Sequence, residues 1–286
     1  GEHADALPQV PQGPDGGLAQ GTEGEEVKHV VNFSGGICSF WAAKRVIDAQ
    51  GTKDVVLLWA DVLIEDDDLT RFMGEAGDFF GVKVTRISEE LSPWDLFDRE
   101  KMIGNSRAPI CSVMLKREPL DLWMRQNTLE MSAIRYIGID WTESHRLDAL
   151  RKAKPTWRIE APMCEPPYWD KCKMQTELAA IGIKPPRLYG MGFPHNNCGG
   201  FCVKAGHAQF ALLHRTMPER YAMHEAREEK LREVVGDFSV MTDRRGDGKK
   251  KPLTMKAFRE RIEAGESFDR NDWGGCGCAI DAEATV

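Results

Sequence analysis

The chain has 286 residues, of which 42% are hydrophobic and 29% are charged, a balance typical of a soluble globular protein with one large domain or a domain plus an appendage. The formal net charge of −7 argues against a broad electrostatic grip on nucleic acid, although it leaves room for a local basic patch. No apolar run is long enough to predict a membrane span, so no membrane partner is expected. Residues 1–25 are rich in Gly, Pro, Gln and acidic side chains without a signal pattern, and we expect a disordered leader.

Eight cysteines are an unusual number for a chain with no visible secretion signal. We therefore expect a cytoplasmic, reducing setting, where clustered cysteines are more often metal ligands or reactive thiols than disulfides. Four of the eight lie in two tight pairs, Cys198 with Cys202 and Cys276 with Cys278.

The first predicted elements are a buried strand that ends at Phe33 and a helix over residues 39–47, joined by Ser34, Gly35 and Gly36. A strand that runs through Gly-Gly into a helix puts free backbone N–H groups and the positive helix end at one point, which suits phosphate. Glycine lets the phosphate approach the main chain, and Ser34 and Ser39 add hydroxyl groups. A plain β-turn-α corner is the alternative, because short glycine motifs have many false positives.

Strands and helices then alternate along the chain. The patterns predict strands over 54–61, 83–87 and 135–140, and helices over 69–80 and from Pro93. This alternation predicts an α/β fold with a mostly parallel sheet. Asp61 falls at the carboxyl end of its strand, where such sheets bind ligands, and the alternative is a strand-end cap.

Two later stretches carry candidate site residues. Cys111 stands beside Ser112, with Lys116 and Arg117 about one helical turn further on. These cations could hold a nucleotide phosphate or lower the pKa of the thiol, whereas a lone cysteine is usually a core residue. Arg146 is a candidate phosphate ligand because a planar guanidinium fits phosphate oxygens two at a time, and a surface ion pair with Glu143 is the alternative.

The composition changes from Lys154 onward, where prolines recur along the chain. We expect a helix over 171–180, one or two helices over 207–235 broken at Pro218, a polar loop over 243–252 and a last helix over 253–263. The predicted division is a nucleotide-binding domain over 26–190 and a mainly helical, cysteine-bearing region over 191–286.

Both cysteine pairs are embedded in glycines, which leave backbone N–H groups free to hydrogen-bond cluster sulfides. Their C-x3-C and C-x-C spacings do not match the paired C-x2-C that zinc commonly uses, so an iron–sulfur cluster is favoured over zinc and over free or redox thiols. The remaining thiols, Cys38, Cys164 and Cys172, are interpreted as buried or incidental. His195, His207 and His214 are interpreted as packing residues or supports for ligands.

With these residues in hand, the sequence resembles the sulfonucleotide (PAPS/APS) reductase-like branch of the PP-loop adenine-nucleotide α-hydrolase superfamily, in particular proteins common in phages and mobile elements. The resemblance runs from about Val30 to Lys204 and rests on five ordered elements: Phe33-Ser34-Gly35-Gly36 with Ser39, Trp59-Ala60-Asp61, Cys111-Ser112 with Lys116 to Leu120, Gly138-Ile139-Asp140 with Glu143-Ser144 and Arg146, and Leu188 to Phe193 before Cys198 and Cys202. It implies a Rossmann-like sheet of about five or six strands, an adenine nucleotide at the strand tips and sulfur chemistry.

The resemblance also implies a [4Fe-4S] cluster. Cys111-Ser112 stands where APS reductases have a Cys-Cys pair, and Cys198 and Cys202 stand where a later C-x2-C pair would be, so a ligand is missing that the tail could supply. The implied ligands are Cys111, Cys198, Cys202 and Cys276, with Cys278 as a sulfur carrier or alternate ligand. ATP-cleaving PP-loop enzymes usually have Asp where this chain has Cys38, which bears on Mg²⁺ handling. The nucleophilic tail cysteine of sulfonucleotide reductases lacks its usual setting here.

Three hypotheses follow. The first is an ATP-dependent sulfurtransferase that acts on an adenylylated acceptor, for which a base or nucleotide in nucleic acid is favoured, with Lys116, Arg146 and Cys278 in the chemistry. The second is an APS or PAPS reductase that releases sulfite, and the third is a non-catalytic nucleotide or cluster sensor. In each, the nucleotide is held by Ser34, Gly35, Gly36, Ser39, Asp61, Arg117 and Gly138. Implied partners are a sulfur donor or thiol reductant, with nucleic acid and a second copy of the chain as further candidates.

Overall fold

The computed structural model describes residues 27–129, 132–243, 245 and 251–275. Its centre is a five-stranded, fully parallel sheet in the order β3-β2-β1-β4-β5. The strands are β1 (Lys28–Asn32), β2 (Val55–Asp61), β3 (Val84–Ser88), β4 (Ala133–Tyr136) and β5 (Arg158–Glu160). The predicted α/β, Rossmann-like class is therefore confirmed.

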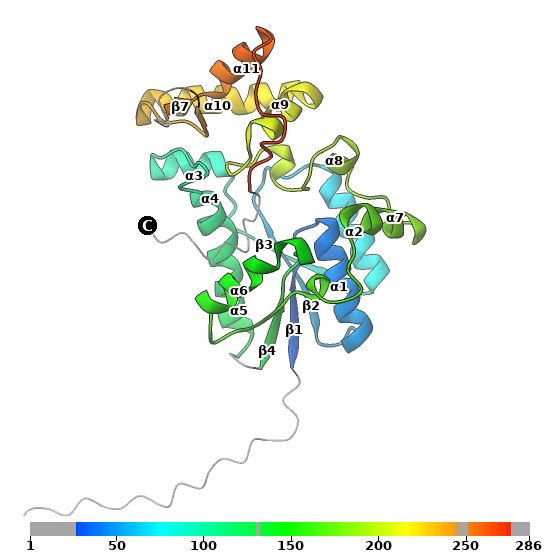
Figure 1. Cartoon of the computed structure of the whole chain (residues 1–286). Coiled ribbons are helices and arrows are strands. Elements are labelled where there is room, and N and C mark those ends of the chain that lie inside the picture. The colour runs from blue at the N-terminus through cyan, green and yellow to red at the C-terminus, as the bar shows by residue number, and fades with distance from the viewer. Residues whose placement is uncertain (1–26, 130–131, 244, 246–250, 276–286) are drawn as a thin grey trace, which may run out of the picture.

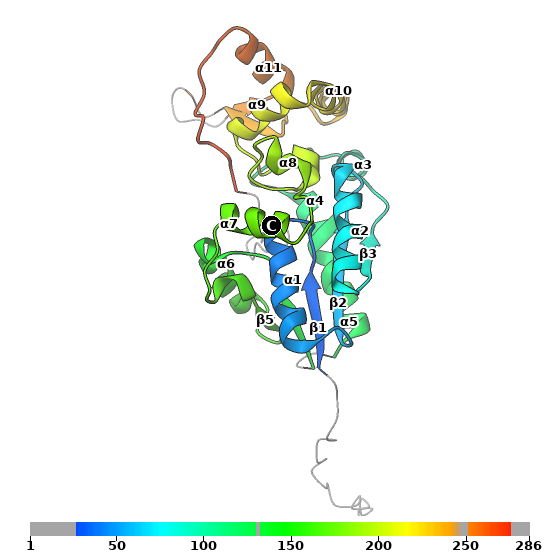
Figure 2. The ribbon, with the colours of Figure 1, turned by 90° about the vertical axis from the view of Figure 1, so that its right-hand side faces the viewer.

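Helices cover both faces of the sheet (Figures 1 and 2). Because side chains alternate along a strand, Val31 of β1 packs with α1 (Ile37–Gln50), α2 (Asp68–Phe80) and α7 (Lys171–Ala180). Val30, the preceding residue, packs on the opposite face with α5 (Glu118–Asn127). Burial on both faces explains why these strands are nearly continuous apolar runs.

The strand order places a topological switch point beside β1. From β1 the chain passes through α1 to β2 on one side, and it later returns to β4 on the other side. Ligands of open α/β sheets bind in the crevice beyond the carboxyl ends of the strands at this point. The fold thus directs attention to the residues that follow β1, β2 and β4.

The C-terminal region lies beyond the carboxyl ends of the strands, as Figures 1 and 2 show. It contains α9 (His207–Thr216), α10 (Pro218–Val235), α11 (Met255–Glu263) and an antiparallel hairpin of β6 (Met241–Asp243) and β7 (Lys251–Leu253). Its apolar core is continuous with Trp94 and Phe97 of α3 (Pro93–Glu100). This core fixes the C-terminal region above the sheet.

Several boundaries differ from prediction. The break at Pro218 is confirmed, but the polar stretch predicted as a loop over 243–252 connects the two strands of a hairpin. β4 ends at Tyr136 rather than at residue 140, and β5 was not predicted. Short segments complete the chain: α4 (Ile110–Ser112), η1 (Val113–Arg117), η2 (Trp141–Glu143), α6 (Ser144–Ala153), η3 (Pro162–Cys164), α8 (Arg187–Gly190) and η4 (Cys198–Gly200).

None of the described helices combines the length and apolar character needed to cross a bilayer.

Candidate functional site

A pocket opens at the carboxyl ends of β2, β1 and β4, and we call it the strand-tip pocket. Of the residues predicted to bind or act on a nucleotide, six line it: Ser34, Gly36, Ser39, Lys116, Gly138 and Arg146. They come from four separate parts of the chain, which the fold brings to one place. Its other lining residues include Leu58, Glu65, Glu143, Lys171, Tyr189 and Asn196.

The turn between β1 and α1 has the geometry expected of a phosphate-binding loop. Gly35 has a left-handed φ of +76°, and a Cβ there would lie 2.1 Å from a methyl group of Leu69. Gly36 caps the 14-residue α1, whose first turn carries no acidic side chain. The helix N-terminus therefore presents backbone amides and the positive end of its dipole to the pocket.

Gly138 is required by a close approach rather than by an unusual φ. A Cβ there would lie 2.6 Å from the Cα of Ser39 and 2.7 Å from its N. The end of β4 thus packs directly against the first turn of α1. Because Gly138 has no side chain, the two backbone segments approach each other closely, and the crevice at the switch point is narrow.

Two side chains from the later part of the chain hold the loop from above. The Tyr189 hydroxyl accepts a hydrogen bond from the Ile37 N–H at 3.3 Å, and the buried Asn196 amide donates to the Gly35 carbonyl at 3.1 Å. Sequence reasoning did not assign Asn196, although two adjacent asparagines before a cysteine were a signal. Tyr189 lies within the segment Leu188 to Phe193 that carries part of the resemblance, and the sequence pattern alone predicts no role for it.

The strand-tip pocket carries paired charges. Lys116 Nζ lies 3.2 Å from Glu65 Oε1, and the Arg146 guanidinium pairs with Glu143. The ion pair weighed as the alternative for Arg146 is therefore present, although both partners line the pocket. Lys171 adds a third cation, whose Nζ donates to the Pro194 carbonyl at 3.1 Å.

Asp61 and Arg117 do not line the strand-tip pocket. Asp61 accepts a hydrogen bond from the Leu63 N–H at 3.0 Å and pairs with Arg86 Nε at 2.8 Å, so it caps the strand end as the alternative interpretation had it. Arg117 ends η1.

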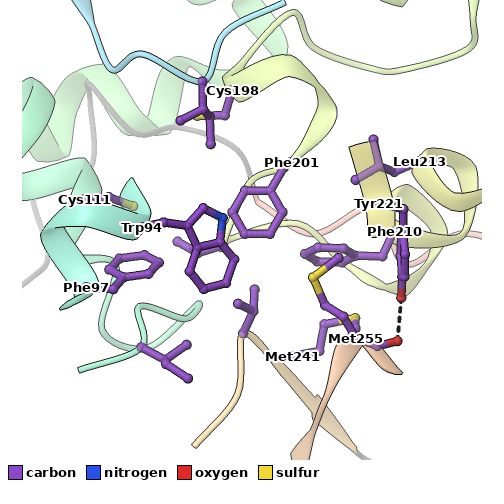
Figure 3. Close-up of a cluster of buried hydrophobic side chains, with 14 of the residues drawn as sticks. Trp94, Phe97, Cys111, Cys198, Phe201, Phe210, Leu213, Tyr221, Met241 and Met255 are labelled. Atoms are coloured by element: carbon purple, nitrogen blue, oxygen red, sulfur yellow. Dashed lines mark hydrogen bonds between the residues drawn. The ribbon is translucent and has the colours of Figure 1, made fainter. Parts of the chain in front are cut away.

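A second, smaller cavity adjoins the first, and we call it the thiol cavity. Cys111, Cys198 and Cys202 all line it, together with Lys116 and Phe201. Figure 3 shows Cys111 and Cys198 in the apolar cluster around Trp94 and Phe201. Three of the four predicted cluster ligands, from two distant stretches, thus meet at one cavity.

The helical turn after Cys111 is widened. Residues 113–117 form a π-helix between α4 and α5. In an α-helix, residues five apart point about 140° apart, whereas a π turn closes between such residues. Cys111 and Lys116, five residues apart, line the same cavity, and Lys116 Nζ lies 3.6 Å from Cys198 Sγ.

On the opposite wall, Cys198 adopts a left-handed φ of +50°, and Gly199 and Gly200 follow at +57° and +85°. A Cβ on Gly199 would lie 1.9 Å from Arg220 Nη2, and one on Gly200 would lie 2.8 Å from Phe193. The two glycines therefore permit the turn that brings Cys198 and Cys202 to one cavity. A left-handed non-glycine residue is strained, and such strain is often found at functional sites.

The start of the C-terminal tail runs beside this turn. The Gly275 N–H donates to the Lys204 carbonyl at 3.1 Å, and the Gly206 N–H donates to the Trp273 carbonyl at 3.0 Å. Cys276 and Cys278 lie outside the described residues. Within the described part of the chain, no group of three or more His, Cys, Asp or Glu side chains has a geometry that could hold a metal ion.

The remaining thiols have other surroundings. Burial raises the pKa of Cys38, which lines the strand-tip pocket, and burial also raises the pKa of Cys164 to about 11. Both are therefore protonated near neutral pH, and a protonated thiol is a poor partner for Mg²⁺, which prefers oxygen ligands. Cys172 is exposed.

No family model matches the chain, and no curated protein matches it. Among solved structures, the chain is similar to the crystal structure of a phosphoadenylyl-sulfate (PAPS) reductase from Candida auris in a phosphate complex. The two are 12% identical with a TM-score of 0.42, and the match covers 59% of this chain and 78% of that chain. The α/β class of the present chain follows from its own strand order rather than from this likeness.

Proposed function

We propose that the chain is an ATP-dependent sulfurtransferase with an iron–sulfur centre beside its nucleotide site. The observation that carries the proposal is the position of Lys116, whose side chain lines both the strand-tip pocket and the thiol cavity. A cation shared by a phosphate-binding loop and a cluster of cysteines fits a reaction that couples phosphate chemistry to sulfur chemistry.

The strand-tip pocket suits an adenine nucleotide. The phosphates would sit on the loop from Ser34 to Ser39, where amides and the helix dipole favour negative charge. The base would take the β2 side, where Leu58 and Leu120 line the pocket. Lys116, Arg146 and Lys171 would then neutralise the charge that develops on the phosphates.

Three cysteine donors line one cavity, and thiolates are the usual ligands of [4Fe-4S] clusters, which are larger than the single metal ion that no group of described residues could hold. Cys111, Cys198 and Cys202 would hold it, with Cys276 as the proposed fourth ligand. The hydrogen bond from the Gly275 N–H to the Lys204 carbonyl supports this choice. Gly275 directly precedes Cys276 in the sequence, and Lys204 follows Cys202 by two residues. When bound, a cluster of this kind supplies a site for inorganic sulfur or for electrons.

The proposed reaction has two stages. An acceptor oxygen attacks the α-phosphorus of ATP, pyrophosphate leaves, and the acceptor becomes adenylylated. The terminal sulfur of a persulfide, carried on Cys278 and supplied by an external sulfur donor, then displaces AMP from the acceptor carbon. A dithiol reductant cleaves the resulting disulfide, which leaves a thiol on the acceptor and regenerates Cys278.

Magnesium is proposed only as a counter-ion carried by the nucleotide. The two carboxylates of the strand-tip pocket, Glu65 and Glu143, are engaged by Lys116 and Arg146. Ligands from the substrate phosphates are the usual way in which Mg²⁺ is held with few protein groups.

The test is anaerobic purification followed by iron and sulfide assays and by product analysis with ATP. We expect about four iron and four sulfide per chain, loss of both in Cys198→Ser, and formation of AMP and pyrophosphate that Ser39→Ala reduces. Cys172→Ser is the matched control, because this thiol is exposed and lines neither cavity. Release of sulfite from APS or PAPS would overturn the proposal. Nucleotide binding with neither sulfite release nor formation of AMP and pyrophosphate would also overturn it.

A further inference from the structure

A buried side-chain amide at the end of β1 lies in the wall of the strand-tip pocket. Asn32 is the last residue of β1, it is only 6% exposed, and it lines the pocket. Within the part of the chain that the structure describes, no atom accepts a hydrogen bond from its Nδ2. A buried donor left without an acceptor is destabilising, and such donors are rare in native proteins. An unpartnered donor in the wall of a ligand pocket indicates that the ligand supplies the acceptor.

The orientation of this amide is fixed by its neighbour on β4. Arg135 Nε donates a hydrogen bond to Asn32 Oδ1 at 3.3 Å. A guanidinium has donors only, so the atom that faces it must be the amide oxygen. The NH2 group of Asn32 therefore points away from Arg135. Because β4 and β2 lie on opposite sides of β1, the NH2 group is on the β2 side of the pocket.

Arg135 is itself held in place. Its side chain is only 4% exposed, and its Nη1 pairs with Asp121 Oδ1 of α5 at 2.5 Å. The second carboxylate oxygen of Asp121 pairs with Lys154. The amide of Asn32 is thus the last member of a chain of polar contacts that runs from Lys154 through Asp121 and Arg135. A donor whose direction is fixed in advance loses little conformational entropy when a ligand binds.

The surroundings of the NH2 group suit a neutral ring rather than a phosphate. Asn32 pairs in register with Leu58 of β2, so the two side chains lie on the same face of the sheet. Leu58 packs on this face with Val30 and with Leu120 of α5, and both leucines line the pocket. A charged phosphate would lose its hydration against these apolar side chains at a much greater cost than a neutral base would. The phosphates already have a site on the loop from Ser34 to Ser39.

Adenine offers an acceptor to this donor only at its ring nitrogens. Its exocyclic amino group is a donor, so a contact with Asn32 has to involve N1, N3 or N7. A purine in which one of these nitrogens is replaced by a C–H group keeps the size and shape of adenine but cannot accept the hydrogen bond. A site that hydrogen-bonds a group of its substrate discriminates strongly against analogues that lack the group, because the buried partner is left unpaired.

We propose that Asn32 Nδ2 donates a hydrogen bond to a ring nitrogen of the adenine in bound ATP, which makes Asn32 a specificity-determining residue of the nucleotide site. The identity of the nucleotide rests on the proposed function. The role of the amide rests on its burial, on its contact with Arg135 and on its place beside Leu58. In this arrangement the loop from Ser34 to Ser39 serves the phosphates, and Asn32 adds the contact to the base.

The test compares ATP with 1-deaza-, 3-deaza- and 7-deaza-ATP on the full chain, with Kd measured by isothermal titration calorimetry. We expect wild type to bind one of the three analogues about 5- to 150-fold more weakly than ATP, the effect of losing about 1–3 kcal/mol. Asn32→Ala should bind ATP more weakly than wild type does, and it should bind that analogue as tightly as ATP. Asn32→Asp keeps an oxygen for Arg135 but replaces the donor with an acceptor, so it should bind that analogue at least as tightly as ATP. Asn127→Ala is the matched control, because this exposed asparagine does not line the pocket and should keep the wild-type ratio.

The ratio of the two Kd values separates a contact with the base from a structural role. If Asn32 only stabilises β1, its variants weaken ATP and the analogue equally and keep the wild-type ratio, which overturns the inference. The inference is also overturned if wild type binds all three analogues as tightly as ATP. Formation of AMP and pyrophosphate is assayed in parallel. A chain that discriminates through Asn32 but forms neither product would refute the proposed function and leave this inference standing, whereas product formation without discrimination would do the reverse.

Discussion

Lys116 and Glu65 form the pair on which the proposed function can be tested most directly. Their side chains are only 12% and 9% exposed, and Nζ and Oε1 are 3.2 Å apart. Lys116→Met would leave the Glu65 carboxylate buried beside an apolar group, and removing one partner of a buried pair costs about 3–5 kcal/mol. A domain of this kind is stable by about 5–15 kcal/mol, so the single variant should unfold at a much lower urea concentration.

The double variant Lys116→Met/Glu65→Gln separates structure from function. It removes both charges, so it should regain about 0.5–3 kcal/mol over the sum of the two single changes, the range measured for residues in contact. Urea unfolding of wild type, both single variants and the double variant gives this coupling energy. A coupling near zero would show that the pair does not form in solution.

The same double variant should be folded but should bind ATP weakly, because the cation has been lost from the strand-tip pocket. It should also alter the reactivity of Cys198, whose sulfur lies 3.6 Å from Lys116 Nζ. If ATP affinity and thiol reactivity both equal those of wild type, Lys116 has a structural role only, and the coupling between the two cavities is refuted.

Three further predictions follow from other contacts. Gly138→Ala should lower the free energy of unfolding by about 1–3 kcal/mol and weaken ATP binding, because its Cβ would meet the first turn of α1. Gly190→Ala is the control and should change neither, because a Cβ there meets nothing within 4 Å. Thermal unfolding and ATP titration check both variants. Gly274→Ala should lower the iron content. Gly274 has a left-handed φ of +73°, and a Cβ there would lie 2.4 Å from backbone atoms of Lys204 and Gly206, so the substitution should break the contact between residue 274 and this turn. Gly275→Ala is the control and should bind iron normally, because a Cβ there meets nothing within 4 Å. Burial raises the pKa of Glu228 to about 7, so the folded protein holds this proton more tightly than the unfolded chain does. The free energy of unfolding should therefore fall as pH rises from about 4.5 to about 7. Glu228→Gln should remove this pH dependence in urea unfolding, and a variant with the wild-type pH dependence would contradict the assignment to Glu228.

The fold was largely predictable because β1, β2 and β4 have buried residues on both faces and the helices are amphipathic or capped. The helix over 171–180 was predicted to the residue. The β6–β7 hairpin was missed because three-residue strands flanking a run of charged and glycine residues carry almost no hydrophobic pattern. β5 escaped for the same reason, since only Ile159 of its three residues is fully buried.

The lining of the two cavities was predictable where it follows from local sequence. The loop from Ser34 to Ser39 and the pair Cys198 and Cys202 could be found from glycine and cysteine spacing alone. Tyr189 and Asn196 could not, because their roles come from hydrogen bonds to residues more than 150 positions away. Asp61 was at the predicted strand end, but Arg86, 25 residues later, engages its carboxylate.

The thiol cavity is bounded by two irregular segments that the fold itself does not require. The helix that contains Cys111 could have continued as α-helix, yet it widens to a π turn over residues 113–117. The facing turn puts Cys198 in a left-handed conformation, which costs a non-glycine residue about 1–3 kcal/mol. Each irregular segment contributes a lining residue to the same cavity: Lys116 from the π turn and Cys198 from the facing turn. Strain of this kind persists where the surrounding structure fixes the residue, and it clusters at active sites and ligand-binding sites.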